Sequence, residues 1–260
     1  MPSSTAQDLH IATPHGRLFA QRWRGGDAAP IVLLHDSLGC VELWRDFPAA
    51  LAAATARDVV AYDRLGFGRS DPHPGRLDAD FIAAEADAGF AHVREALALE
   101  RFVAFGHSVG GGMAVGCAAR YRAQCRALVT ESAQAFVEDR TRDGILAARA
   151  AFAEPGQAER LGKYHGDKAA WVLSAWIDTW LAPQFADWNL DAQLAGVCCP
   201  TLAIHGERDE YGSARHPERI AAGVRGPATL SVLPGCGHVP HRERAGETLE
   251  LVAAWLRTVN

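Results

Sequence analysis

Ser108 stands between Gly106 and Gly110 in the pattern G-H-S-V-G, which places a candidate nucleophile between two flexible residues. The apolar run 102–105 precedes it and the small-residue stretch 110–119 follows, which predicts a strand, a sharp turn and a helix. The glycines remove Cβ atoms that would collide in so tight a bend, so the hydroxyl is exposed. Free N–H groups at the start of the helix face it. The segment predicts a nucleophile elbow.

A serine hydroxyl becomes a good nucleophile only when a base takes its proton, and that base needs an orienting acid. Two later segments supply both groups. The predicted strand 200–206 ends just before Asp209, and the predicted strand 229–233 is followed by a glycine-containing loop that carries His238. Because the carboxyl ends of parallel strands meet at one edge of a sheet, these side chains are expected to converge on Ser108.

The order along the chain, Ser108 then Asp209 then His238, is the order of the α/β-hydrolase triad. The chain therefore resembles the α/β-hydrolase family, from about residue 8 to its C-terminus. The resemblance implies that Ser108 is the nucleophile, His238 the general base and Asp209 the orienting acid. Residues 62–71 also look like the family's D-x-x-G-x-G-x-S turn, whose role there is structural.

An oxyanion hole requires backbone N–H groups aimed at the charge that develops on the substrate. Val109, the residue after the nucleophile, is expected to provide one. In the family the second donor follows a His-Gly pair after an early strand, and on the loop 35–39 this implies Ser37. Asp36 departs from the usual glycine, and aspartate tolerates left-handed backbone angles. A carboxylate beside an oxyanion would oppose catalysis, so we expect the Asp36 side chain to point away.

Two other carboxylates are candidates for a role in the site. Glu210 is the alternative to Asp209 as the orienting acid, and the family's H-G-x-x-D pattern, which begins at His205, favours Asp209. Glu131 follows a strand that should end beside the elbow, so we expect it to border the pocket. There it would favour an ammonium-bearing substrate, unless it caps a segment or pairs with an arginine.

The elements that position these residues alternate between strand and helix. We expect an opening hairpin from Leu9–Ala12 and Leu18–Trp23, then a strand over 30–35, a helix near 41–54, a strand over 59–62, a long helix over about 79–99, the elbow strand and helix, and a strand over 127–130. Such alternation predicts an α/β fold, with a mostly parallel sheet and helices on both faces.

Between residues 132 and 194 the alternation stops, and the segments 145–152 and 168–180 are helical in character. In α/β-hydrolases an insertion at this place is a cap over the active site. We therefore expect a core formed by 1–133 and 191–260 and a helical cap formed by 134–190.

Tryptophans are frequent in the expected cap, at positions 171, 176, 180 and 188. At least one of these rings should face the pocket, because an acyl group needs an apolar wall and these are the largest apolar surfaces inserted there. The substrate pocket is expected to include Leu38, Glu131, Trp176 and Trp180.

Composition narrows the class of protein. A chain of 260 residues with 48% hydrophobic and 22% charged residues suits one globular domain. A net charge of −5 and the lack of a basic cluster give no reason to expect nucleic acid. Residues 1–12 lack the features of a signal peptide, and no stretch reaches the ~18 apolar residues of a membrane span. We expect a cytoplasmic protein.

Six cysteines are scattered along the chain without metal-ligand spacing. They are expected to be reduced thiols, with Cys40 and Cys236 contributing packing or pocket wall in the catalytic loops. No cofactor motif is found, so we expect no cofactor and no metal.

The leading hypothesis is a serine hydrolase that cleaves a small or medium carboxylic ester through an acyl-enzyme. The loops 35–48 and 209–212 are similar to those of bacterial carboxylesterases of the pimeloyl-ester type. A carbon–carbon bond hydrolase of dienoates and a cofactor-free haloperoxidase are alternatives within the family. Haloalkane dehalogenases need an aspartate nucleophile, which Ser108 excludes. A non-catalytic hydrolase-like binding protein is the alternative from another class, and the intact triad disfavours it.

Overall fold

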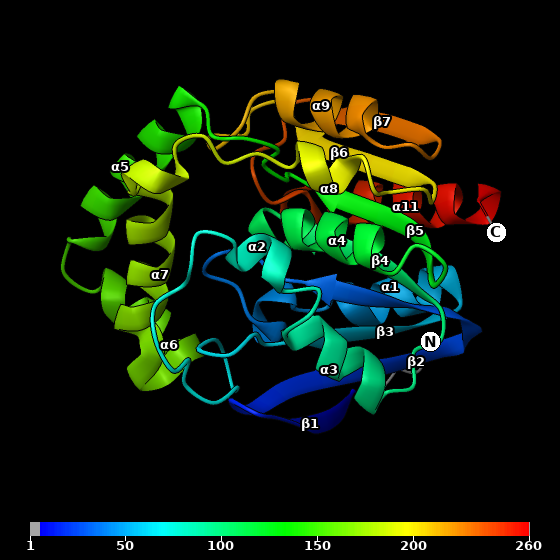
Figure 1. Cartoon of the computed structure of the whole chain (residues 1–260), viewed down its shortest axis with the longest axis horizontal. Coiled ribbons are helices and arrows are strands. Elements are labelled where there is room, and N and C mark those ends of the chain that lie inside the picture. Colours follow the sequence, from blue (N-terminus) through cyan, green and yellow to red (C-terminus); the bar gives the residue numbers. More distant parts are fainter. Residues whose placement is uncertain (1–5, 260) are drawn as a thin grey trace.

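The computed structural model describes residues 6–259, and these contain a seven-stranded sheet in the order β1-β2-β4-β5-β6-β7, with β3 paired to β2 (Figure 1). The expectation that residues 1–12 are not a signal peptide falls partly on residues 1–5, which lie outside the described residues. The strands are β1 (Gln7–Thr13), β2 (Gly16–Leu34), β3 (Arg57–Tyr62), β4 (Phe102–His107), β5 (Cys125–Glu131), β6 (Thr201–Gly206) and β7 (Ala228–Leu233).

The sheet is mostly parallel, as the alternating sequence predicted. The pairs β2–β4, β4–β5, β5–β6 and β6–β7 are parallel, whereas β1 and β2 form the antiparallel opening hairpin. β2 is one long strand that pairs with β3 twice. Residues 20–23 pair with residues 62 to 59 of β3, in antiparallel order, and residues 31–33 pair with residues 59 to 61, in parallel order. All residues of β3, β4 and β6 are buried, and most of them are apolar; the exceptions include Arg57 and Asp58 at the start of β3.

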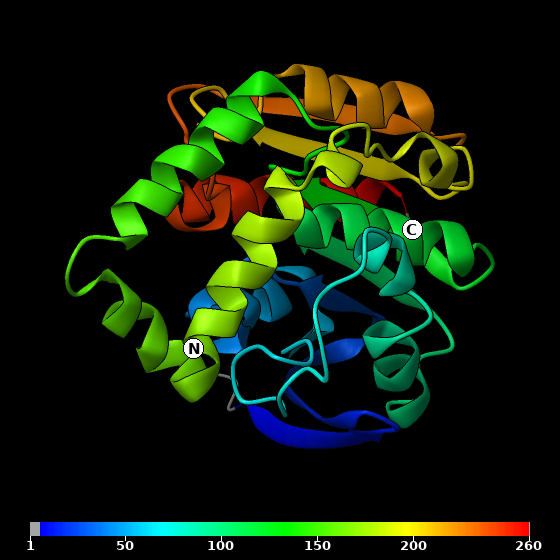
Figure 2. The ribbon, with the colours of Figure 1, turned by 60° about the vertical axis from the view of Figure 1, so that its left-hand side comes forward.

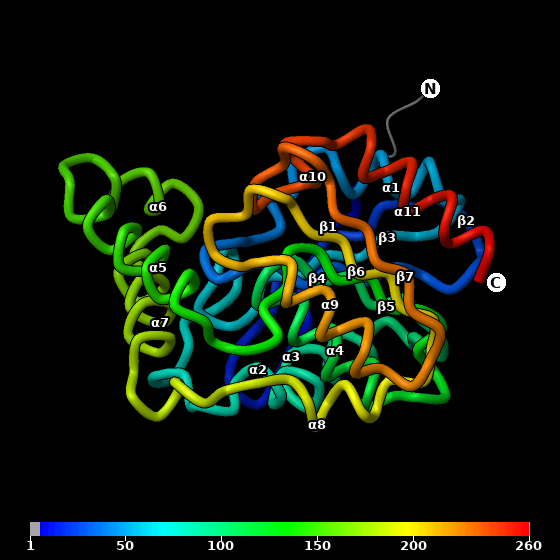
Figure 3. The backbone as a smooth tube through the Cα atoms, turned by 90° about the horizontal axis from the view of Figure 1, so that it is seen from above, coloured from blue at the N-terminus to red at the C-terminus, as the bar shows by residue number. Residues whose placement is uncertain are grey.

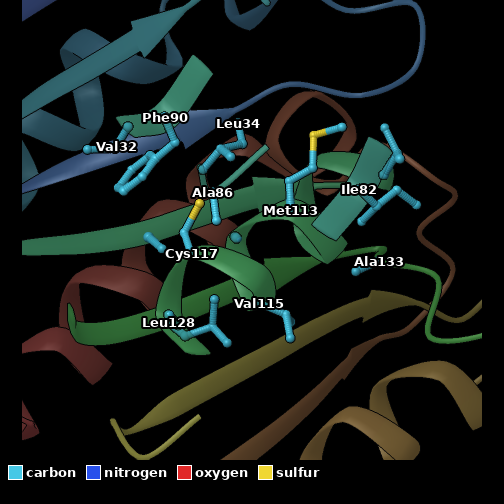
Figure 4. Packing of buried hydrophobic residues seen from close by; sticks show 14 of the residues in the cluster. Val32, Leu34, Ile82, Ala86, Phe90, Met113, Val115, Cys117, Leu128 and Ala133 are labelled. Atoms are coloured by element: carbon cyan, nitrogen blue, oxygen red, sulfur yellow. The ribbon is translucent and has the colours of Figure 1, made fainter. Parts of the chain in front are cut away.

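Helices cover both faces of the sheet (Figures 1 and 3). One face carries α1 (Phe47–Thr55), α10 (Pro240–Glu243) and α11 (Ala245–Thr258); the other carries α2 (Phe81–Ala84), α3 (Gly89–Ala96), α4 (Val109–Arg120), α8 (Asp191–Leu194) and α9 (Arg215–Gly223). Figure 4 shows the second face, where Phe90, Met113 and Leu128 belong to one buried cluster. These packed layers fix the strand ends from which the site is built.

The expected long helix over 79–99 is wrong, because the chain forms α2 and α3 with a break at Glu85. The Glu85 side chain turns inward to accept a 2.6 Å hydrogen bond from the Tyr62 hydroxyl, and only 8% of the residue is exposed. The expected helix near 41–54 is also divided. A short 3₁₀ helix, η1 (Val41–Trp44), ends at Arg45, whose φ of 53° interrupts the helical path before α1.

Residues 134–190 form three further helices, α5 (Asp139–Phe152), α6 (Gln157–His165) and α7 (Ala169–Leu181), with the 3₁₀ turns η2 (Gly166–Lys168) and η3 (Pro183–Phe185). Figures 1 and 3 show these helices beyond one end of the sheet, and Figure 2 shows them turned towards the viewer. The segment 145–152 lies in α5 as predicted, and the segment 168–180 lies in α7 except for Lys168, which belongs to η2; α6 was not anticipated. No helix within residues 6–259 has the length and apolar character needed to cross a membrane.

Candidate active site

Ser108 lies at the sharp turn between β4 and α4, with φ 56° and ψ −126°. This left-handed conformation is strained for a residue with a side chain. A Cβ on Gly106 would strike the Gly110 carbonyl, and one on Gly110 would strike the Leu34 carbonyl, so both glycines are required. The turn is held by a 2.8 Å hydrogen bond from the Ser108 N–H to the Glu131 carbonyl. The predicted elbow is therefore present.

The structure brings Ser108, His238 and Asp209 together at the carboxyl ends of β4, β7 and β6. The Oγ atom of Ser108 lies 3.0 Å from Nε2 of His238, and Nδ1 of His238 lies 2.8 Å from both carboxylate oxygens of Asp209. Ser108 is 7% exposed, His238 8% and Asp209 1%. This geometry can move a proton from the hydroxyl to the imidazole and stabilise the resulting imidazolium.

Asp209, and not Glu210, contacts the His238 ring. Its Oδ1 atom also accepts a 2.8 Å hydrogen bond from the Tyr211 N–H. Burial disfavours ionisation of this carboxyl, but hydrogen bonding and charge attraction from His238 leave its pKa below the usual value. Asp209 is therefore a carboxylate that orients the imidazole, and Glu210 is exposed at the wall of the adjoining cavity.

The two expected oxyanion donors lie on different elements: Ser37 is in the loop after β2, and Val109 is the first residue of α4. Within residues 6–259, neither the Ser37 N–H nor the Val109 N–H donates a hydrogen bond to the protein. Asp36 shapes this loop in place of glycine, since its Oδ1 atom accepts from the Leu38 N–H at 3.2 Å. Its Oδ2 atom lies 3.4 Å from Nδ1 of His107. The carboxylate is thus engaged by other groups, although the residue also borders the cavity.

The turn at 62–71 holds the loop of Asp36 and Ser37 in place through hydrogen bonds. Arg64 donates through Nη2 to the Asp36 carbonyl at 2.8 Å. Asp63 accepts from the Val41 N–H at 2.6 Å and from the Arg69 N–H at 2.7 Å. Burial raises the pKa of Asp63 to about 6. These contacts agree with the structural role that the resemblance implied for this turn.

A cavity of about 220 Å³ lies above Ser108 and His238. It is lined by Asp36, Ser37, Leu38, Ser108, Gln134, Thr141, Ile145, Trp176, Trp180, Glu210, Tyr211, His238 and Val239. Trp176 and Trp180 from α7 form part of this wall. Trp171 instead packs on Phe67 and donates to the Gly75 carbonyl at 2.8 Å, and Trp188 packs on Trp180. Leu38, Trp176 and Trp180 are thus at the pocket.

The expectation that Glu131 borders the pocket is wrong. Glu131 is 0% exposed, and its carboxylate faces away from the cavity towards His241. It accepts from the His241 N–H at 2.5 Å and pairs with Nδ1 of the same ring at 2.7 Å. Burial disfavours the charge, but the His241 contacts leave the pKa of Glu131 below its usual value. Its partner is a histidine that lies only three residues after His238 in the sequence.

Of the cavity-lining residues that were missed from the sequence, Gln134 and Tyr211 contact the proposed triad. Gln134 places Oε1 3.4 Å from Ser108 Oγ, and the Tyr211 ring packs edge-on against His238 with centroids 4.7 Å apart. No local motif marks either residue. Cys40 and Cys236 are buried outside the cavity wall, and burial raises their pKa values to about 12 and about 11. Both thiols pack among buried groups, and the raised pKa values disfavour the thiolate.

One buried cluster has metal-binding side chains: His107, Glu131 and His241 offer atoms within 4.8 Å of one another. However, both carboxylate oxygens of Glu131 already contact His241. The arrangement is that of a buried hydrogen-bonded pair, in which each oxygen of the Glu131 carboxylate already accepts from His241.

Comparisons with known proteins agree with this geometry. Residues 29–154 match the model of the α/β-hydrolase fold family. The serine hydrolase BPHL of Mus musculus is 29% identical over 254 residues, which cover 95% of this chain and 85% of that protein. A non-heme haloperoxidase of Rhodococcus erythropolis is 25% identical over 92% of this chain and 93% of its own.

A thermophilic esterase from Thermogutta terrifontis superposes with a TM-score of 0.72, at 22% identity, over 98% of this chain and 99% of that chain. At this identity the likeness shows the fold alone. Taken with the sheet order, the elbow and the match to the family model, it shows that the chain has the α/β-hydrolase fold.

Proposed function

We propose that this protein is a serine hydrolase that cleaves a small or medium carboxylic ester through an acyl-enzyme. The observation that carries the proposal is the hydrogen-bonded chain from Ser108 through His238 to Asp209 at the floor of the cavity. A hydroxyl in a strained elbow, a base at 3.0 Å and a buried carboxylate behind that base form an activated nucleophile.

The proposed reaction has two halves. His238 Nε2 takes the proton of Ser108 as Oγ bonds to the ester carbonyl, and the N–H groups of Ser37 and Val109 stabilise the oxyanion. The C–O bond to the alcohol breaks, and His238 returns the proton to the leaving oxygen. Water then attacks the acyl-enzyme with the same base and releases the acid and Ser108.

The cavity supports a neutral substrate of limited size. Its wall joins apolar side chains from α5 and α7 to the polar groups around Ser108, and the helices of 134–190 act as the proposed cap that excludes water. Among the described residues that line it there is no lysine or arginine, whereas Asp36 and Glu210 are acidic. A dienoate carries a carboxylate and would find no cation here, so the lining favours an ester.

A cofactor-free haloperoxidase is the second candidate, favoured by the match to the Rhodococcus enzyme along 92% of this chain.

We also propose a cytoplasmic location, which is supported by six cysteines that are all free within the described residues. Cell fractionation tests the location.

The test of function is a panel of p-nitrophenyl esters, neutral and anionic esters, lactones and dienoates, assayed with the wild-type protein and Ser108→Ala. Turnover of neutral esters that is lost in the variant supports the proposal. Turnover of dienoates alone, or halide- and peroxide-dependent halogenation without ester turnover, would support the corresponding alternative. No turnover with any of these substrates would favour a binding protein.

A further inference from the structure

His107, the residue before the nucleophile, lies between two loops of the proposed site and is only 2% exposed. Its Nε2 atom is 2.8 Å from the carbonyl oxygen of His238, and its Nδ1 atom is 3.4 Å from Oδ2 of Asp36. One ring thus bridges the loop of the proposed base and the oxyanion loop. The bridging residue, His107, is therefore part of the nucleophile elbow itself.

The two partners determine the protonation of the ring. A carbonyl oxygen only accepts, so Nε2 of His107 must carry a hydrogen. A neutral ring would then turn the lone pair of Nδ1 towards the Asp36 carboxylate, and two acceptors would face each other. A proton on Nδ1 replaces this repulsion with an ion pair.

The groups packed around His107 also favour the protonated ring. Asp36 lies on the oxyanion loop, Glu131 ends β5, and the rings of His238 and His241 have centroids 5.1 and 4.9 Å from that of His107. Burial disfavours the cation, but the carboxylates of Asp36 and Glu131 raise the pKa of His107 to about 9. In turn, His107 holds the pKa of Asp36 below its usual range.

We infer that His107 is a positioning residue, held as an imidazolium that ties the oxyanion loop to the His238 loop, with Asp36 as its counter-ion. This inference rests on the proposed function. It accounts for Asp36 at a position where the resemblance implies glycine, because glycine cannot pair with the cation. The ring touches no reacting atom and acts through the placement of Ser37 N–H and His238.

Loss of the proton on His107 should loosen the oxyanion loop, which acts in the transition state. We therefore expect kcat for a neutral ester to fall in a one-proton step with a midpoint near pH 9, with little change in KM. Below that pH the ion pair is present, so kcat should be independent of this group.

The variant His107→Gln tests the bridge, because its amide N–H can still donate to the His238 carbonyl and it carries no charge at any pH. We expect kcat at pH 7 to fall about 10-fold, less than the loss of a whole oxyanion donor, and the step near pH 9 to disappear. Asp36→Asn should keep the step but move it towards the usual histidine pKa of about 6.5. A step that stays near pH 9 in both variants would overturn the inference.

A second measurement needs neither turnover nor a stable His107 variant. Ring nitrogen NMR of Ser108→Ala protein, with His107 assigned by comparison with Asp36→Asn, should show a doubly protonated His107 ring at pH 7 that titrates near pH 9. A neutral ring at pH 7 would refute the inference even if esters are hydrolysed. Conversely, a protonated ring in a protein without esterase activity would refute only the proposed function.

Discussion

The carboxylate of Glu131 accepts hydrogen bonds from both the backbone N–H of His241, at 2.5 Å, and its ring Nδ1, at 2.7 Å. The backbone carbonyl of the same glutamate accepts the N–H of Ser108 at 2.8 Å. One residue at the end of β5 therefore connects the elbow to the helix that follows the His238 loop. Glu131 therefore helps to fix the position of Ser108 relative to the loop of His238.

Glu131→Ala should lower the free energy of unfolding by about 3–5 kcal/mol, because it leaves the buried His241 ring without its partner. Glu131→Gln should lower the free energy of unfolding by less, since its amide oxygen still accepts one hydrogen bond.

The stabilisation by Glu131 should also depend on pH, because its pKa is lowered in the folded protein. It is present above the unfolded pKa of about 4.3 and is lost as the pH falls through the folded pKa. Urea unfolding at pH 7 and at pH 3 measures both effects. A wild-type advantage over Glu131→Gln that does not shrink in acid would contradict an ionised Glu131 carboxylate.

Ser108→Ala should lower ester hydrolysis by about 10³-fold or more and leave the fold intact, because it removes the nucleophile from a turn held by the backbone. Initial rates with p-nitrophenyl acetate and the melting temperature measure the two parts. A phosphonate inhibitor should label Ser108 alone. Labelling of a cysteine, or full activity of pure variant protein, would end the assignment.

Asp209→Asn should lower kcat by about 10³–10⁴-fold, since an amide can hold the imidazole in the wrong tautomer and does not stabilise its positive charge. Glu210→Gln is the matched control: it changes the neighbouring carboxyl in the same way and should leave kcat within about 2-fold, because that group is exposed and does not contact His238. The comparison is made with one neutral ester at saturation. Equal losses in the two variants would show that Asp209 is not the orienting acid.

Trp176→Ala should raise KM for longer acyl chains, by about 10-fold for octanoate, and leave acetate nearly unchanged, because each buried CH₂ contributes about 0.8 kcal/mol. Trp171→Ala is the control, since this ring packs on Phe67 outside the cavity wall. It should lower the melting temperature without altering the acyl-length profile. If both variants show only the stability loss, acyl specificity arises elsewhere in the cavity.

Several features of the site could be predicted from sequence because they are local backbone requirements. Gly106 and Gly110 mark the elbow, since a Cβ at either position would strike a backbone carbonyl. Asp209 and His238 follow apolar strands, and parallel strands in one sheet end at the same edge. Their meeting with Ser108 therefore follows from the order of elements along the chain.

The direction of each polar side chain was decided by tertiary structure. Glu131 was expected at the pocket, but its partner His241 lies 110 positions away, and only the packed loops bring the two together. The break between α2 and α3 has the same origin, because a helical pattern does not reveal that the Tyr62 hydroxyl will donate a hydrogen bond to the buried Glu85 carboxylate. Asp36 and His107 are likewise joined across two loops. Local pattern determines where the chain turns, whereas the cost of burying an unpaired charge determines which distant groups must meet.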